Sequence, residues 1–66
     1  MKDVNVGANI RQYREGLSMT QQQLAEAVGT TITQIGRYER NEQDPTATKL
    51  IAIARVLKVD PGDLLQ

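Results

Sequence analysis

Hydrophobic residues recur along the chain at the spacing of an α-helix. In the clearest stripe, Leu50, Ile53, Ala54 and Leu57 stand at i, i+3, i+4 and i+7, which is one face of an amphipathic helix. β-branched residues do not alternate with polar ones, so the pattern predicts helices and no strands. The other apolar stripes are Val6, Ile10 and Leu17; Leu24, Ala25 and Val28; Ile35 and Tyr38; and Leu64 with Leu65.

Polar residues between the stripes indicate where the helices begin. Thr20-Gln21-Gln22-Gln23 has the form of a capping box, in which the Thr hydroxyl and the Gln side chain each bond a free amide. Thr31-Ile32-Thr33-Gln34 repeats this form. Asp60-Pro61-Gly62-Asp63 places a capping residue before Pro and an acid in the first turn. Thr46 is the expected cap of the helix that carries the clearest stripe.

Residues that tolerate a left-handed backbone indicate where helices end. Gly16, Gly29 and Asn41 each follow an apolar stripe, and helices commonly end in a left-handed Gly or Asn. The two sets of signals together predict five short helices, over residues 5–16, 21–28, 32–40, 47–57 and 61–65.

Length and composition limit the possible functions. The chain has 66 residues, no His and no Cys, and its only serine is Ser18. A chain near this length buries about 60% of its unfolded surface, so we expect a single domain over residues 1–66 without a deep substrate cleft. The usual zinc ligands and the Ser-His-Asp and Cys-His arrangements are missing. We therefore expect no enzyme activity, no metal, no cofactor and no small-molecule ligand.

No apolar run approaches the roughly 20 residues that span a bilayer. Met1-Lys2-Asp3-Val4-Asn5 carries an acid and an amide where a signal peptide would have an apolar core. We expect a cytoplasmic protein with no membrane association.

The second and third predicted helices are separated only by Gly29-Thr30-Thr31, which is the form of a helix-turn-helix. The order of residues over 20–29 and 33–40 strongly resembles the lambda-repressor/Cro-type (xenobiotic-response-element) helix-turn-helix family. Ile10, Arg11 and Arg14 before this segment and residues 50–59 after it extend the resemblance over nearly the whole chain. The resemblance implies an all-α, five-helix lambda-repressor-like domain, with the helix-turn-helix at about 20–40. It also implies sequence-specific binding of double-stranded DNA, usually as a symmetric dimer.

The third predicted helix has the dimensions for reading base pairs. A helix of about eight residues is roughly 12 Å long and fits the major groove, which is about 12 Å wide. Four residues lie on its face away from Ile35 and Tyr38, and we assign them to base contacts: Ile32, Thr33, Gly36 and Arg37.

Each of these residues also has a structural alternative. The Arg37 guanidinium matches the two acceptors of guanine, but it could be only a solvated surface group. Thr33 could bond a base edge or touch a thymine methyl, or be merely exposed. Ile32 could contact thymine methyl groups or be half-buried in the core. Gly36 allows close approach either to DNA or to the first helix, and the sequence does not decide between them.

We assign a second group of residues to phosphate contacts. Amides at a helix N-terminus attract phosphate, which favours Thr20 and Gln21. The family position matching Gln21 both contacts phosphate and braces the base-reading helix. The other assigned residues are Thr31, Arg40 and Asn41. The resemblance further implies a purely structural ion pair between Arg14 and Glu39.

The net charge and an acidic segment argue against tight DNA binding. Eight Lys and Arg are balanced by eight Asp and Glu, and Asn41-Glu42-Gln43-Asp44 is acidic where relatives often carry basic residues. Few phosphate contacts predict modest affinity and a shallow salt dependence. The first hypothesis is a homodimeric repressor on a pseudo-palindromic operator with half-sites about 34 Å apart. Its dimer surface would include Pro45, Val59 and Leu65.

The second hypothesis is a protein-interaction module that keeps the fold, such as an antitoxin-like or scaffold component. An exposed Ile32 beside the acidic Glu42 and Asp44 would favour it. Loss of salt-sensitive DNA binding on Arg37→Ala would count against it.

Overall fold

The computed structural model describes residues 5–66, and these form five helices and no strand. Residues 1–4, on which most of the argument against a signal peptide depends, lie outside the described part. Each helix begins and ends within one residue of its predicted bounds, which confirms the all-α prediction. The helices are α1 (Val6–Gly16), α2 (Gln21–Val28), α3 (Ile32–Glu39), α4 (Ala47–Leu57) and α5 (Pro61–Leu64).

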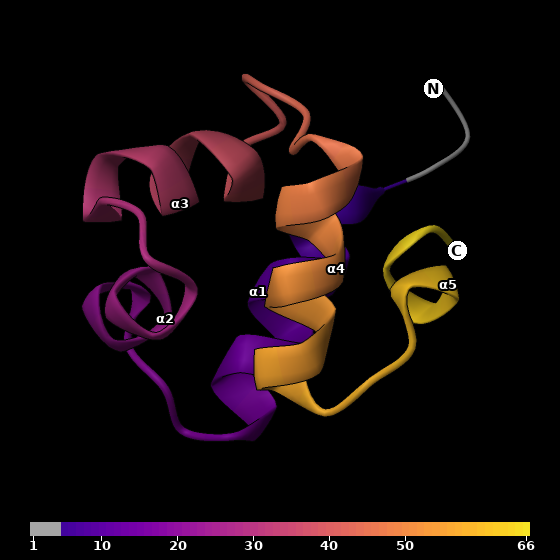
Figure 1. The fold of residues 1–66 in the computed structure, drawn as a ribbon, viewed down its shortest axis with the longest axis horizontal. Helices are drawn as coiled ribbons and strands as arrows, with labels where there is room; N and C mark the ends of the chain where they lie inside the picture. The colour runs from indigo at the N-terminus through magenta and orange to yellow at the C-terminus, as the bar shows by residue number, and fades with distance from the viewer. Residues whose placement is uncertain (1–4) are drawn as a thin grey trace.

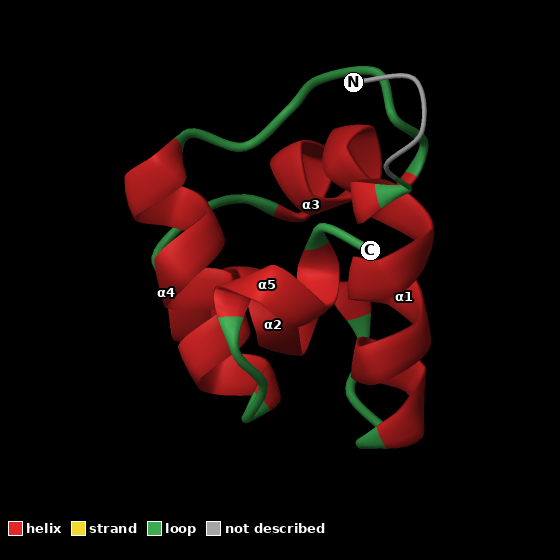
Figure 2. Ribbon diagram, turned by 90° about the vertical axis from the view of Figure 1, so that its right-hand side faces the viewer, coloured by secondary structure: helices red, strands yellow, loops and turns green. Residues whose placement is uncertain are grey.

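The helices are arranged around α1 and α4. α2 and α3 lie to one side of these two helices and α5 to the other (Figure 1). α5 packs against both α1 and α4, in front of the space between them (Figure 2). α3 packs on α1 and α2 and lies at the top of the molecule in Figure 1. None of the described helices is long and apolar enough to cross a membrane.

The core takes at least one residue from every helix. Its fully or almost fully buried hydrophobic residues are Ile10, Leu24, Ala25, Ile35, Tyr38, Ile53, Ala54, Leu57 and Leu64. All of these belong to the predicted stripes. Leu17 and Leu65 do not join them and are 42% and 41% exposed. Both follow the last residue of their helix, so the helical spacing no longer directs them inward.

The predicted caps form at α2, α3 and α4. The hydroxyls of Thr20, Thr31 and Thr46 each accept a hydrogen bond from the backbone N–H three residues on, at 3.0–3.2 Å. At Thr20 the box is complete, because its own N–H donates to the side chain of Gln23 at 2.8 Å. Within the described residues, Thr31 has only the hydroxyl half of the box.

Replacing Thr20 by Ala is expected to lower the free energy of unfolding by about 1 kcal/mol, because the amide of Gln23 loses its partner. Urea unfolding followed by circular dichroism measures the change. Thr48→Ala is the control, since Thr48 is exposed within α4 and Ala is the better helix former. Equal stability of the two variants would contradict a role for the cap.

The helix ends follow the predictions with two differences. Gly29 and Asn41 adopt left-handed backbones, with φ of 81° and 58°. The prediction for Gly16 is wrong: Gly16 is the last residue of α1, and Ser18 takes the left-handed conformation with φ 58°. Lys58 ends α4 with φ 63°, although no Gly or Asn marks that position.

Candidate nucleic-acid interface

α2 and α3 form a compact helix-turn-helix. The turn begins at Gly29, whose N–H donates to the carbonyl of Ala25 at 2.9 Å, and the N–H of Thr30 donates to the same carbonyl at 2.9 Å. Leu24 and Ala25 of α2 and Ile35 of α3 are fully buried in the core that the two helices share. This packing fixes the direction in which the opposite face of α3 points.

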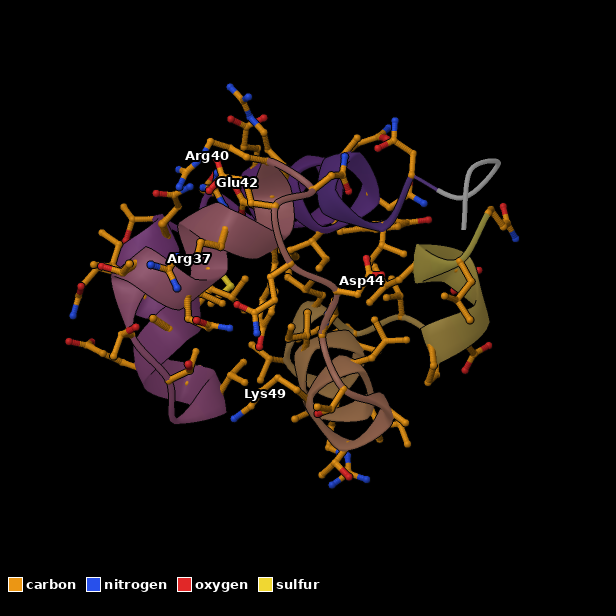
Figure 3. All side chains as sticks on the ribbon, turned by 90° about the horizontal axis from the view of Figure 1, so that it is seen from above. Arg37, Arg40, Glu42, Asp44 and Lys49 are labelled. Atoms are coloured by element: carbon orange, nitrogen blue, oxygen red, sulfur yellow. The ribbon has the colours of Figure 1, made fainter. Side chains whose placement is uncertain are left out.

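The opposite face of α3 is uncovered. Thr33 and Arg37 are exposed and one turn apart, and Figure 3 shows Arg37 on the side of α3 that faces the viewer. Ile32, the first residue of α3, is 46% exposed, so it is not a core residue. Three of the four predicted base-contacting residues are therefore open to a ligand in the described structure.

Gly36, the fourth predicted base-contacting residue, is buried beneath the side chain of Arg40. A Cβ placed on Gly36 would lie 2.9 Å from Nη1 of Arg40. The three atoms nearest to that Cβ all belong to the Arg40 guanidinium, and none belongs to α1. The missing side chain of Gly36 therefore makes room for Arg40, and a base edge can reach Gly36 only after Arg40 moves.

Arg40 forms an exposed ion pair with Glu42. Its Nε donates to Oε2 of Glu42 at 2.6 Å, and its Nη2 donates to Oε1 at 3.4 Å. The hydrogen bond that Arg40 donates to Glu42 raises the pKa of Arg40 above its ordinary value. The hydrogen bond from Arg40, with a smaller contribution from the charge of Arg37, lowers the pKa of Glu42. Of the two acidic residues in the loop after α3, Glu42 thus lies beside the predicted phosphate-binding residue Arg40, and Asp44 lies apart from it (Figure 3).

The predicted phosphate residues at the helix starts already make intramolecular hydrogen bonds. The hydroxyls of Thr20 and Thr31 accept from backbone amides, as described above. Nε2 of Gln21 donates to Oε1 of Glu39 at 3.0 Å, which ties the start of α2 to the end of α3. The bracing contact predicted for Gln21 is thus present.

Asn41 fastens the end of α3 to the start of α1. Its Oδ1 accepts from the N–H of Gly7 at 3.1 Å, and its Nδ2 donates to Oδ1 of Asn5 at 3.2 Å. Its own N–H donates to the carbonyl of Tyr38 at 3.1 Å. The backbone N–H and both side-chain polar atoms of Asn41, a predicted phosphate contact, therefore each have an intramolecular partner in the described structure.

Arg14 and Glu39 form the predicted structural ion pair. Nε and Nη2 of Arg14 donate to the two carboxylate oxygens of Glu39 at 2.7 and 3.1 Å, and Nη1 donates to the carbonyl of Met19 at 2.7 Å. The side chains of Arg14 and Glu39 are only 10% and 4% exposed. Hydrogen bonding to Glu39 raises the pKa of Arg14, against the lowering effect of burial. The pair holds α1 to α3.

The structure also places the residues predicted for other surfaces. Pro45 and Val59, predicted for the dimer surface, lie just beyond the two ends of α4, an 11-residue helix about 16 Å long, and Val59 packs in part on the core. Ile32 begins α3, whereas Glu42 follows its far end and is paired with Arg40. The apolar and acidic residues that favoured an interaction module thus do not form one patch.

Comparisons with known proteins agree with this geometry. A helix-turn-helix family model matches residues 10–64. An uncharacterized HTH-type transcriptional regulator of Sinorhizobium fredii, y4wC, is 42% identical over 60 residues, which is 91% of this chain. The HTH-type transcriptional regulator DicA of Escherichia coli is 33% identical over 64 residues, or 97% of this chain. The chain spans only 42% and 47% of the lengths of these two relatives.

A solved structure shares this fold over most of the chain. The c2 repressor of Salmonella phage P22, in complex with a synthetic operator, superimposes with a TM-score of 0.88 and 33% sequence identity. The match covers 92% of this chain and 92% of that chain. The predicted lambda-repressor-like fold is therefore confirmed.

Proposed function

Because this chain belongs to the helix-turn-helix family whose model matches residues 10–64, we propose that it is a DNA-binding transcriptional regulator that recognises an operator through α3. The predicted family resemblance is confirmed by that match and by the relatives. The single observation that carries the proposal is the uncovered face of α3, where Ile32, Thr33 and Arg37 are all exposed.

These three side chains suit the edges of base pairs in the major groove. The Arg37 guanidinium can donate two hydrogen bonds to O6 and N7 of a guanine. Thr33 can bond a base edge, and Ile32 can contact thymine methyl groups. α3 has eight residues and is about 12 Å long, which matches the width of the groove.

Phosphate contacts would position α3 in the groove. The first amides of α2 and α3 have no partner within their helices, and they attract phosphate. The hydroxyls of Thr20 and Thr31 accept from backbone amides and keep a proton with which to donate to phosphate. Gln21 keeps a second N–H for the same purpose. Arg40 supplies a charge, and Asn41 likewise keeps a second side-chain N–H. Gly36, predicted as a base contact, would contribute only after Arg40 moves.

We further propose that the protein acts as a homodimeric repressor. Two copies of α3 on one side of the DNA would meet two half-sites about 34 Å apart, in a pseudo-palindromic operator. The P22 relative is itself a repressor that was solved with an operator, which supports this choice over activation. Sedimentation of the protein with and without a two-half-site duplex tests whether it binds as a dimer.

Selection of bound sequences from a random duplex pool tests the proposed function. The wild type is expected to enrich a two-fold symmetric motif. Arg37→Ala is expected to lose about 1–3 kcal/mol of discrimination at one base pair of each half-site. Arg55→Ala is the matched control, because it removes the same charge from an exposed position near the end of α4.

Loss of selectivity in Arg37→Ala with retention in Arg55→Ala would support recognition through α3. No enrichment by the folded wild type, even at low salt, would contradict the proposed function. An unchanged motif in Arg37→Ala would leave DNA binding in place but assign recognition to other residues.

A further inference from the structure

The Arg40–Glu42 pair lies against the same face of α3 that carries the proposed base contacts. Thr33, Gly36 and Arg37 stand at i, i+3 and i+4 in α3, so they share one side of the helix, and Arg40 is the residue that follows its last turn. The Arg40 guanidinium folds back over Gly36. Glu42 holds it there with two hydrogen bonds. In the protein without DNA, the carboxylate of Glu42 is thus already bonded to Arg40, which is a predicted phosphate contact.

We infer that Glu42 competes with a DNA phosphate for Arg40, so that binding of DNA includes the opening of this internal ion pair. The inference depends on the proposed function, because it concerns the same surface. Glu42 is then a residue that weakens the affinity for every sequence, since a phosphate contact carries no sequence information.

The competition follows from the geometry of the guanidinium. Carboxylates and phosphates both accept two parallel hydrogen bonds from one side of the group, and Glu42 already accepts from Nε and Nη2. A phosphate can therefore use this edge only if Glu42 leaves it. A displaced Glu42, two residues along the chain, would still repel the phosphate.

The exposure of the pair allows it to open. The side chains of Arg40 and Glu42 are 58% and 53% exposed, and water screens such pairs so that they are individually weak. The buried Arg14–Glu39 pair, at 10% and 4% exposure, differs in this respect. Once the exposed pair opens, Arg40 could leave its place over the helix as DNA approaches. Gly36 would then be uncovered.

Glu42→Gln tests the inference, with Asp44→Asn as the matched control. Both substitutions remove one negative charge from an exposed position in the same loop (Figure 3). Asp44 makes no ion pair with any other residue in the part of the chain that the structure describes. The probe is a 30-base-pair duplex of mixed sequence at low salt, because phosphate contacts need no operator.

Glu42→Gln is expected to tighten binding about two- to fivefold more than Asp44→Asn, in keeping with the small strength of an exposed ion pair. The slope of log affinity against log salt is expected to steepen by up to about 0.9, the value for one phosphate contact. In an Arg40→Gln background the extra gain from Glu42→Gln is expected to disappear, because no cation is left to release.

A titration of Glu42 by NMR, without DNA, measures whether the pair forms in solution. Its pKa is expected to lie below the ordinary value in the wild type and to return toward it in Arg40→Gln. Equal gains from Glu42→Gln and Asp44→Asn, with operator selection by the wild type intact, would overturn the inference and leave the proposed function in place. Failure of the wild type and of Glu42→Gln to bind any duplex would overturn both.

Discussion

Glu39→Ala is expected to lower the free energy of unfolding by about 3–5 kcal/mol, the usual cost of removing one partner from a buried ion pair. The substitution leaves the guanidinium of Arg14 buried with two of its hydrogen bonds lost. It also removes the acceptor of Gln21. A domain of this size has a total stability of about 3–10 kcal/mol, so much of the variant would be unfolded at 25 °C.

Urea titration followed by circular dichroism measures this loss, and Glu15→Ala is its control. Glu15 also faces Arg14, with Oε2 3.9 Å from Nη2, but its side chain is 54% exposed. Its removal is expected to cost less than about 1 kcal/mol. Similar stabilities of the two variants would contradict the structural role of the Arg14–Glu39 pair. Replacing both Arg14 and Glu39 by hydrophobic residues should recover most of the stability.

The helices could be predicted because their signals are local. A capping hydroxyl such as that of Thr20 bonds an amide three residues away, so the sequence over one turn contains the whole interaction. The i, i+3, i+4 spacing likewise places residues such as Ile53 and Leu57 on one face, and the core lies there. The bounds of α2 and α4 therefore match their predictions at both ends.

The turn after α1 could not be predicted in the same way. The chain continues past Gly16, and the N–H of Ser18 donates to the carbonyl of Glu15 at 2.9 Å while that of Met19 donates to Arg14 at 3.1 Å. Arg14 also bonds the carbonyl of Met19. The position of this turn depends on the buried ion pair, whose partner Glu39 is 25 residues away along the chain. The preference of Gly for a left-handed backbone therefore did not determine where the chain turns after α1.

The exposed face of α3 could be predicted from the sequence. The hydrogen-bond partners of Arg40 and Asn41, the two residues that follow α3, could not. Whether Arg40 is free or bonded to Glu42 depends on the backbone conformation at Asn41, which has φ 58°. The side-chain oxygen of Asn41 in turn accepts a hydrogen bond from the N–H of Gly7, 34 residues earlier. No sequence pattern indicated this contact, since a Gly near the start of a helix has many ordinary explanations.

Gly7→Ala is expected to lower the free energy of unfolding by about 3 kcal/mol, at the upper end of the usual cost of overpacking. A Cβ on Gly7 would clash with the carbonyl oxygen of Tyr38 and would lie 2.7 Å from that of Glu39. Both atoms belong to the backbone of α3, so no side chain can rotate out of the way. α1 would have to separate from the end of α3, and the bond from Gly7 to Asn41 would be lost.

Gly16→Ala in the same helix is the matched control and is expected to change stability in the opposite direction. A Cβ on Gly16 would meet no atom within 4 Å beyond its chain neighbours and the backbone of its own helix, so the substitution only replaces Gly by a better helix former, a gain of up to about 1 kcal/mol. Thermal and urea unfolding of both variants measure the difference. If Gly7→Ala were as stable as Gly16→Ala, α1 and α3 could not be in the close contact described here. Because that contact positions α3, the proposed function further predicts that any folded fraction of Gly7→Ala binds DNA more weakly than the wild type.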